Sequence, residues 1–258
     1  MAWVFNIKFL LISLFSLQLI FWYGISPIWQ GTKYIKPELG IVPPVPGEEE
    51  VKLFSFGDDE FYFRVMGFQI QNSGDTYGRS TSLKDYDYSM LSKWWRVFDS
   101  LDFKSNLVPS MVSYYFGSTP NHKEQIPYVV DYLETHADKD PRTKWWWYSQ
   151  AIYNAKHKMK DLDRALIIAN KLASVPRDVD MPIWARQMPA FMLEKKGEYN
   201  EACDIIINII DSHKNLSEGE MNFMIHFINE RIIAMQEKEG NGERVDPRCK
   251  ALFSALRK

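Results

Sequence analysis

The 258-residue chain has only two cysteines, Cys203 and Cys249, and its charges nearly cancel. Two cysteines cannot form a disulfide framework or a cysteine-rich zinc site, and they do not identify a redox compartment. We expect Cys203 to be an inert core residue and the fold to depend on no disulfide. Lys and Arg number 31 against 33 Asp and Glu, a net charge of −2. This balance provides no basic field for nucleic acid, so DNA and RNA are not expected as partners.

Signatures of catalysis and of a bound metal or cofactor are also lacking. The five histidines form no His-Glu-x-x-His pattern and no His/Cys pair at ligand spacing. Acidic pairs such as Asp58-Asp59 and Asp161-x-Asp163 continue into no calcium loop, and they precede expected helices, where carboxylates cap N-termini. No Gly-x-Ser-x-Gly, Walker or dinucleotide-binding glycine pattern occurs. The sequence therefore predicts no enzyme, no catalytic residue, no metal site and no cofactor.

One long hydrophobic run is present near the N-terminus. Phe9 to Ile28 contains no charged residue, and a helix of that length rises ~30 Å, enough to cross a hydrocarbon core. A cleaved signal peptide is the alternative, but this run exceeds the usual ~7–15 residues and lacks a small-x-small cleavage site. We therefore expect an uncleaved transmembrane anchor with its flanks in residues 1–36. Lysines lie on both sides of the run, so the positive-inside rule barely distinguishes the two possible orientations of the anchor in the membrane. A cytoplasmic N-terminus and an extracytoplasmic body are favoured.

A proline-rich segment follows the anchor. Residues 37–47 hold four of the 13 prolines, which predicts an extended, polyproline-like spacer that holds the body away from the membrane. Residues 48–56 are too short to assign and form either an extended arm or a turn of helix. We group residues 37–57 as a linker and arm.

Residues 58–258 carry an internal repeat. One helical pattern of apolar residues recurs four times, beginning at Leu91, Ile126, Ala165 and Ala202. Further helix-like stretches separate the copies, at roughly 59–73, 106–117, 141–158 and 181–196. Single hairpins cannot bury a core and must stack on their neighbours. The pattern predicts an all-α fold, an α-solenoid of about four helical hairpins plus closing helices, with a kink or a later helix start at Pro127 and Pro189.

The best-defined copy resembles a tetratricopeptide repeat. Lys196-Gly197-Glu-Tyr199-Asn-Glu-Ala202 is similar to the turn and second-helix start of that family, and the segment from Lys160 to Ala165 matches it without the glycine. The two earlier copies depart from the family pattern, because Leu91 and Ile126 occupy the position of its small residue. The resemblance implies a protein-binding scaffold and no reaction.

Two features are candidates for binding. Consecutive aromatics occur in the first helices of the hairpins, and they cannot share one face because adjacent helical residues point 100° apart. They are either core shared between neighbouring hairpins or the lining of a groove. The long connection at residues 74–84 is either functional or disordered. The candidate protein-binding residues are Tyr114, Tyr115, Trp145, Trp146, Trp147, Tyr77, Arg79 and Lys84.

Together these features predict a membrane-anchored helical-repeat scaffold or adaptor. It would bind partner proteins, including those of a membrane complex, next to the bilayer. The alternative is an extracytoplasmic module that binds or processes glycans on aromatic platforms. A processing enzyme would need two carboxylates about 5–10 Å apart facing one cleft.

Overall fold

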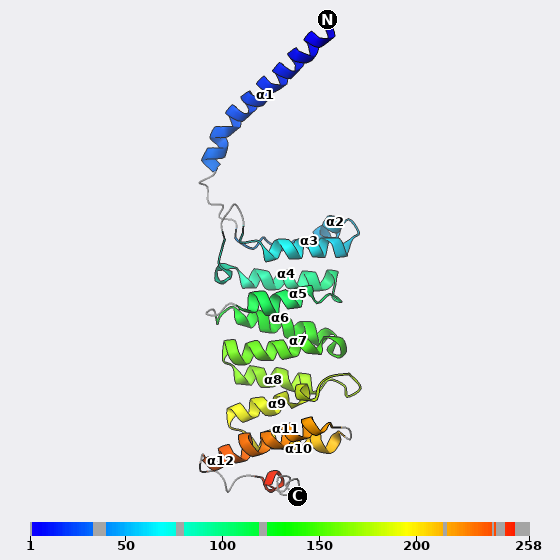
Figure 1. Cartoon of the computed structure of the whole chain (residues 1–258), viewed down its shortest axis with the longest axis vertical. Helices are drawn as coiled ribbons and strands as arrows, with labels where there is room; N and C mark the ends of the chain where they lie inside the picture. Colours follow the sequence, from blue (N-terminus) through cyan, green and yellow to red (C-terminus); the bar gives the residue numbers. More distant parts are fainter. Residues whose placement is uncertain are drawn as a thin grey trace. The chain divides into compact units, whose positions relative to one another are not determined.

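The computed structural model describes residues 2–32, 40–75, 80–118, 123–213, 216–238, 240 and 246–250. All secondary structure in these residues is helical, which confirms the all-α prediction (Figure 1). The chain divides into two compact units, Met1–Gly40 and Ile41–Lys258.

The first unit contains helix α1, Ala2–Thr32. Within it, Phe9–Pro27 is a stretch of 19 residues with a mean hydropathy of 1.8, and none of it is buried. By length and composition this helix can cross a membrane. The coarse form of the anchor prediction, one apolar N-terminal helix of spanning length, is therefore confirmed.

The second unit begins with part of the proline-rich segment. Val42 is buried in the core, and the indole Nε1 of Trp94 donates a hydrogen bond to the Pro43 carbonyl oxygen at 2.9 Å. The predicted stand-off spacer over residues 37–47 therefore does not hold for residues 41–46, because this stretch packs on the body. Residues 37–39 lie outside the described chain. Of the two alternatives for residues 48–56, the structure shows the helix: α2, Glu48–Ser55, which starts with a hydrogen bond from the Gly47 N–H to the Glu50 carboxylate.

The helices that follow match the expected stretches closely. They are α3 (Asp59–Gln71), η1 (Leu83–Asp85), α4 (Tyr88–Leu101), α5 (Leu107–Ser110), η2 (Met111–Tyr115), η3 (Phe116–Ser118), α6 (Ile126–Lys139), α7 (Pro141–Asn154), η4 (Ala155–Met159), α8 (Leu162–Ala173), α9 (Ile183–Lys196), α10 (Tyr199–Ser212), α11 (Glu218–His226), η5 (Phe227–Ile233) and α12 (Ala234–Lys238).

Capping residues set where these helices begin. The side chains of Asp58, Asp87 and Asp161 accept the N–H of the third helical residue in α3, α4 and α8, as expected of acidic residues at N-termini. Helix α6 begins at Ile126, so Pro127 lies in its first turn, where no intrahelical donor is lost. Helix α9 continues through Pro189 without ending, contrary to a later start there.

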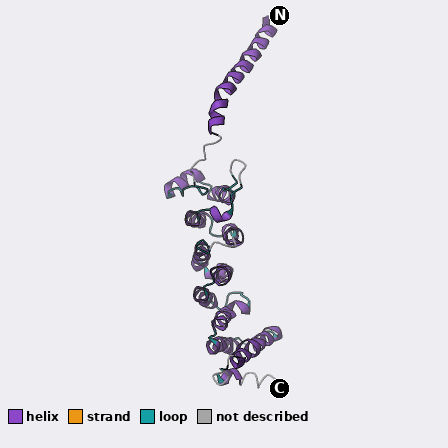
Figure 2. Cartoon of the chain, turned by 90° about the vertical axis from the view of Figure 1, so that its left-hand side faces the viewer, coloured by secondary structure: helices purple, strands orange, loops and turns teal. Residues whose placement is uncertain are grey.

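Consecutive helices of the second unit pack side by side. Helix α6 contacts α7, α7 contacts α8, α8 contacts α9, and α9 contacts α10. Seen nearly end-on, these helices alternate between two columns (Figure 2). The first residues of the four pattern copies are all buried, and so are Leu172 and Ile209 further along the last two. The helical periodicity therefore identified the inward faces correctly.

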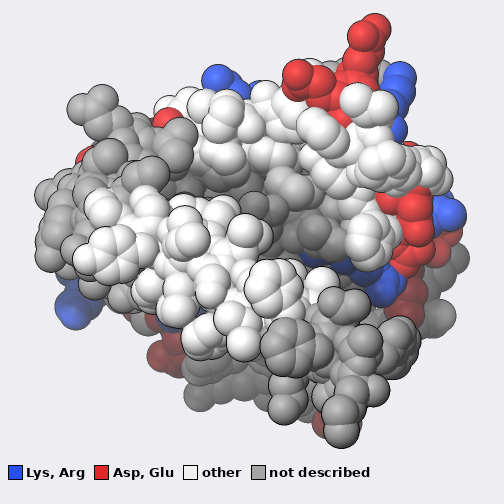
Figure 3. All heavy atoms as spheres, turned by 90° about the horizontal axis from the view of Figure 1, so that it is seen from above, with Lys and Arg blue, Asp and Glu red and all other residues white. Residues whose placement is uncertain are grey.

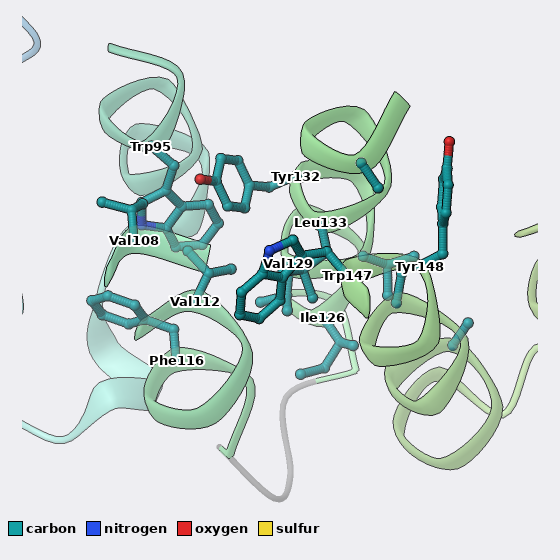
Figure 4. Close-up of a cluster of buried hydrophobic side chains, with 14 of the residues drawn as sticks. Trp95, Val108, Val112, Phe116, Ile126, Val129, Tyr132, Leu133, Trp147 and Tyr148 are labelled. Atoms are coloured by element: carbon teal, nitrogen blue, oxygen red, sulfur yellow. The ribbon is translucent and has the colours of Figure 1, made fainter. Parts of the chain in front are cut away.

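Aromatic side chains fill the core between α4 and α7. Trp95 is fully buried, and its ring centroid lies 5.6 Å from that of Phe116 and 5.5 Å from that of Tyr132. Apolar residues of η2, α6 and α7 surround this group (Figure 4). Aromatic residues of α4, η3 and α6 thus meet around one indole.

The structure corrects the expectation that the fold depends on no disulfide. Cys203, on α10, is bonded to Cys249, with a Cα–Cα distance of 6.3 Å. The segment around Cys249 also contacts α10 through an Arg248–Asp204 ion pair, and the Asp246 N–H donates to the Asn200 side chain at 3.2 Å. The two cysteines are 46 residues apart, and only the return of the C-terminal segment to α10 brings them together.

Candidate protein-binding groove

A groove of about 560 Å³ runs along the first helices of three hairpins. It is bounded by η2 and η3, by α7 with η4, and by α9. The lining residues are Ser113, Tyr114, Gly117, Ser118, Trp146, Ser149, Gln150, Tyr153, Asn154, Lys158, Trp184 and Met188.

Helix α7 provides one complete face of this groove. Trp146, Ser149, Gln150, Tyr153 and Asn154 follow the i, i+3, i+4, i+7, i+8 spacing of a single helix face. The neighbouring residues on α7 point into the core, where Trp147 is 4% exposed, while Trp146 is 41% exposed. The run of three tryptophans is therefore divided between core and groove, because the helix turns by 100° at each residue.

The aromatic wall of the groove comes from three hairpins. The indole N–H of Trp146 donates to the Tyr114 hydroxyl at 3.2 Å, which joins α7 to η2. On the other side, the Trp184 ring lies edge-on to Trp146, at a centroid distance of 6.3 Å. Tyr114 is 56% exposed, so both it and Trp146 present ring surface to solvent.

The floor of the groove is polar. Asn154 is almost completely buried, and its Nδ2 donates to the Gln150 carbonyl oxygen at 2.9 Å. Its Oδ1 has no hydrogen-bond partner within the described residues. A Cβ at Gly117 would lie only 3.2 Å from that oxygen, so the absence of a side chain there leaves Oδ1 uncrowded. A buried acceptor without a partner is costly.

Lys158 is the one charged residue among the described residues that line the groove. Lys158 donates from Nζ to the Gly117 carbonyl oxygen, and burial lowers the pKa of its ammonium group. No aspartate or glutamate belongs to the described lining, so that part of the groove lacks the carboxylate pair that glycan hydrolysis uses. It offers aromatic faces, amides and hydroxyls.

The structure distributes the sequence-predicted binding residues over several environments. Tyr114 and Trp146 line the groove, while Tyr115 and Trp145 are partly buried against the core cluster, and Trp147 is a core residue.

Of the three candidates from the 74–84 connection, the structure describes only Lys84, which is not among the groove-lining residues. Lys84 lies in η1, where its carbonyl oxygen accepts a hydrogen bond from Gln125 Nε2 at 2.7 Å. Tyr77 and Arg79 fall outside the described residues.

Sequence reasoning missed several residues of the groove. Tyr153 and Asn154 continue the α7 face that Trp146 begins, so extending the 3.6-residue period from Trp146 would have found them. Lys158 lies beyond α7, in the π-helical η4, where that period no longer holds. Trp184 lies outside any aromatic run in the sequence. No local signal indicates that its ring, on α9, contacts that of Trp146, on α7.

The chain has no significant match to any protein-family model, curated protein sequence or solved structure.

Proposed function

We propose that the protein is a membrane-anchored adaptor whose body is a tetratricopeptide-like α-solenoid and whose groove binds a peptide segment of a partner protein. The observation that carries the proposal is the groove itself. Exposed aromatics from neighbouring first helices line it, beside the amide residues Gln150 and Asn154. Aromatic side chains are typical anchors of interface energy, and few of them commonly account for most of the affinity.

The turn between α9 and α10 supports the repeat architecture. Gly197 ends α9 with φ 81, a left-handed conformation that favours glycine, and Tyr199 and Ala202 then start α10 as buried residues. The glycine, aromatic and small residue therefore have the structural roles that the tetratricopeptide pattern implies. In such stacks the first helices of the hairpins line one surface, and the groove follows that surface here.

The disulfide supports an extracytoplasmic body. Disulfides persist in oxidising compartments and are rare in the cytosol, where thiols are kept reduced. The bond between Cys203 and Cys249 therefore favours a cytoplasmic N-terminus, a span at Phe9–Pro27 and a body on the opposite side of the membrane.

We expect a membrane-impermeant maleimide reagent, added to intact cells, to label Ile167→Cys, because that position is 52% exposed on α8. A cysteine at Asn6, on the other side of the proposed span, is expected to react only after the membrane is opened. The reverse pattern would place the body in the cytoplasm. Release of the protein from membranes by alkaline carbonate would show that it is not an integral membrane protein and would contradict the proposed anchor.

The groove is tested by comparing two aromatic substitutions of similar exposure. Trp146→Ala removes a groove residue, whereas Tyr128→Ala removes a 38% exposed tyrosine of α6 that lies outside it. Proteins that co-purify from detergent-solubilised membranes are quantified by mass spectrometry. We expect Trp146→Ala to weaken the affinity for the partner by about 30-fold, which corresponds to ~2 kcal/mol. Tyr128→Ala is expected to leave that affinity unchanged.

Circular dichroism of both variants separates binding from folding. Loss of the partner only in variants that also lose helicity would show that the aromatics act through the core. Equal retention in both variants, or retention of polysaccharide instead of protein, would contradict a peptide groove.

A further inference from the structure

Helix α3 is apolar on two opposite faces. Phe63, Gly67 and Ile70 are buried, and α3 contacts α4. Phe61, Val65 and Phe68 follow the same i, i+4, i+7 spacing but point the other way, and they are 64%, 44% and 71% exposed. A helix with apolar residues on two opposite faces normally packs on both of them. Helix α3 contacts α2 and α4 (Figure 1), but its second apolar face stays exposed.

Helix α2, which contacts α3, also carries exposed apolar side chains. Leu53 and Phe54 are exposed there, and Phe56, at the end of α2, is 91% exposed with φ 50. A left-handed conformation is unfavourable for phenylalanine, so this ring is held outward at a cost. In the described part of the second unit, the large apolar side chains exposed by more than 60% all belong to this surface. We call it the cap face and define it as Leu53, Phe54, Phe56, Phe61, Val65 and Phe68.

Acidic residues flank the cap-face residues in the sequence. Residues 48–64 contain six carboxylates, at 48–50 and 58–60, against the two cations Lys52 and Arg64. Arg64 is paired with Glu60. Seen from above, basic side chains lie among the acidic ones along one side of the molecule (Figure 3). The chain that forms the cap face therefore carries an excess of negative charge, and we call its six carboxylates the negative rim.

We propose that the cap face binds an amphipathic helix of a partner protein, with an apolar stripe flanked by Lys and Arg. A helix fits because the opposite face of α3 already packs on helix α4, so a second helix would extend the same arrangement. Basic flanks fit because they complement the negative rim.

Other occupants fit less well. A second copy would bring two negative rims together, and like charges across an interface are repulsive. A lipid surface with anionic headgroups would repel the same rim. This surface is separate from the groove, so loss of one binding activity leaves the other measurable.

The test uses the full chain in nanodiscs of zwitterionic phosphatidylcholine, with empty nanodiscs as background. Two labelled 18-residue helical peptides share one leucine stripe, and their remaining positions are Lys in one and Glu in the other. Fluorescence anisotropy is expected to show the Leu/Lys peptide bound at least about tenfold more tightly, and 0.5 M NaCl is expected to weaken it. Phe68→Ser should lower that affinity by about tenfold, whereas Ile167→Ser, an exposed apolar residue of α8, should not.

Two further variants decide between occupants. Asp59→Lys leaves the apolar stripe intact, and it should weaken the Leu/Lys peptide and strengthen the Leu/Glu peptide. Equal affinity for both peptides, or no effect of Phe68→Ser in a protein of unchanged helicity, would overturn the proposal. A disulfide-linked dimer of Phe61→Cys would assign the face to a second copy. Quenching of a dye on Phe61→Cys by spin-labelled lipid would assign it to the bilayer.

Discussion

Replacing Trp95 with alanine is expected to lower the free energy of unfolding by about 3–5 kcal/mol. Trp95 is fully buried, and its indole contacts Tyr88, Phe116 and Tyr132, which come from different elements. The cavity left by its removal would lie where α4, η3 and α6 meet, so no single helix can shift to fill it. Urea unfolding of the full chain in detergent, followed by circular dichroism, measures the loss.

Trp146→Ala is the matched control for this change. It removes the same side chain from a position 41% exposed to solvent, so much less apolar surface returns to water. We expect a loss of about 1 kcal/mol or less. Equal losses for the two tryptophans would mean that the groove aromatics belong to the core and would weaken the proposed function.

Replacing Asp99 with alanine is expected to cost a similar amount, about 3–5 kcal/mol, because buried polar groups lose their partner. The Asp99 carboxylate is 4% exposed and accepts a hydrogen bond from the Tyr132 hydroxyl at 2.8 Å. His136 Nδ1, with a side chain of zero exposure, lies 2.9 Å from the carboxylate, and Lys139 Nζ lies 3.0 Å away. His136 Nε2 already has no partner in the described structure, so the histidine would be left with none.

The cost of Asp99→Ala depends on pH. Burial by itself raises the pKa of the Asp99 carboxyl, but hydrogen bonds from His136, Tyr132 and Lys139 and the His136 charge outweigh it, and the pKa is lowered. A lowered folded-state pKa stabilises the protein above the ordinary aspartate value of about 4, and this stabilisation is lost as the pH falls further. The stability difference between the wild type and Asp99→Ala should therefore be largest near neutral pH and shrink below about pH 4.

Asp131→Ala is the control, because Asp131 pairs with Arg164 but is 56% exposed. An exposed ion pair contributes about 0–1 kcal/mol, so this change should have little effect at any pH. A pH-independent difference for Asp99→Ala, or equal effects of the two substitutions, would show that the Asp99 network contributes no specific charge stabilisation.

The helical stretches could be predicted because their signals are local. The spacing of apolar residues identifies helix faces, and residues such as Asp58, Asp161 and Ser217 mark helix starts within a few positions. These signals gave the helical stretches and their buried faces without knowledge of any distant contact. The solenoid arrangement itself needs contacts between hairpins, which periodicity does not contain.

The features that sequence reasoning missed depend on distant pairs. The Trp94–Pro43 hydrogen bond joins residues 51 positions apart, and the disulfide joins residues 46 apart. Proline-rich composition indicates an extended backbone but does not say whether that backbone lies in solvent or on a tryptophan. Likewise, the run at 145–147 predicts that its members face different directions, but only the position of α9 shows which of them lines a groove with Trp184.

Site-specific photo-crosslinking in intact membranes tests the adaptor proposal most directly. A benzoylphenylalanine is placed at Tyr153, which lines the groove and is 53% exposed, or at Tyr128, which is exposed outside it. The proposal predicts a discrete adduct with a protein partner from position 153, and none from position 128. The same adducts from both positions, or only carbohydrate adducts from position 153, would contradict a peptide-binding groove.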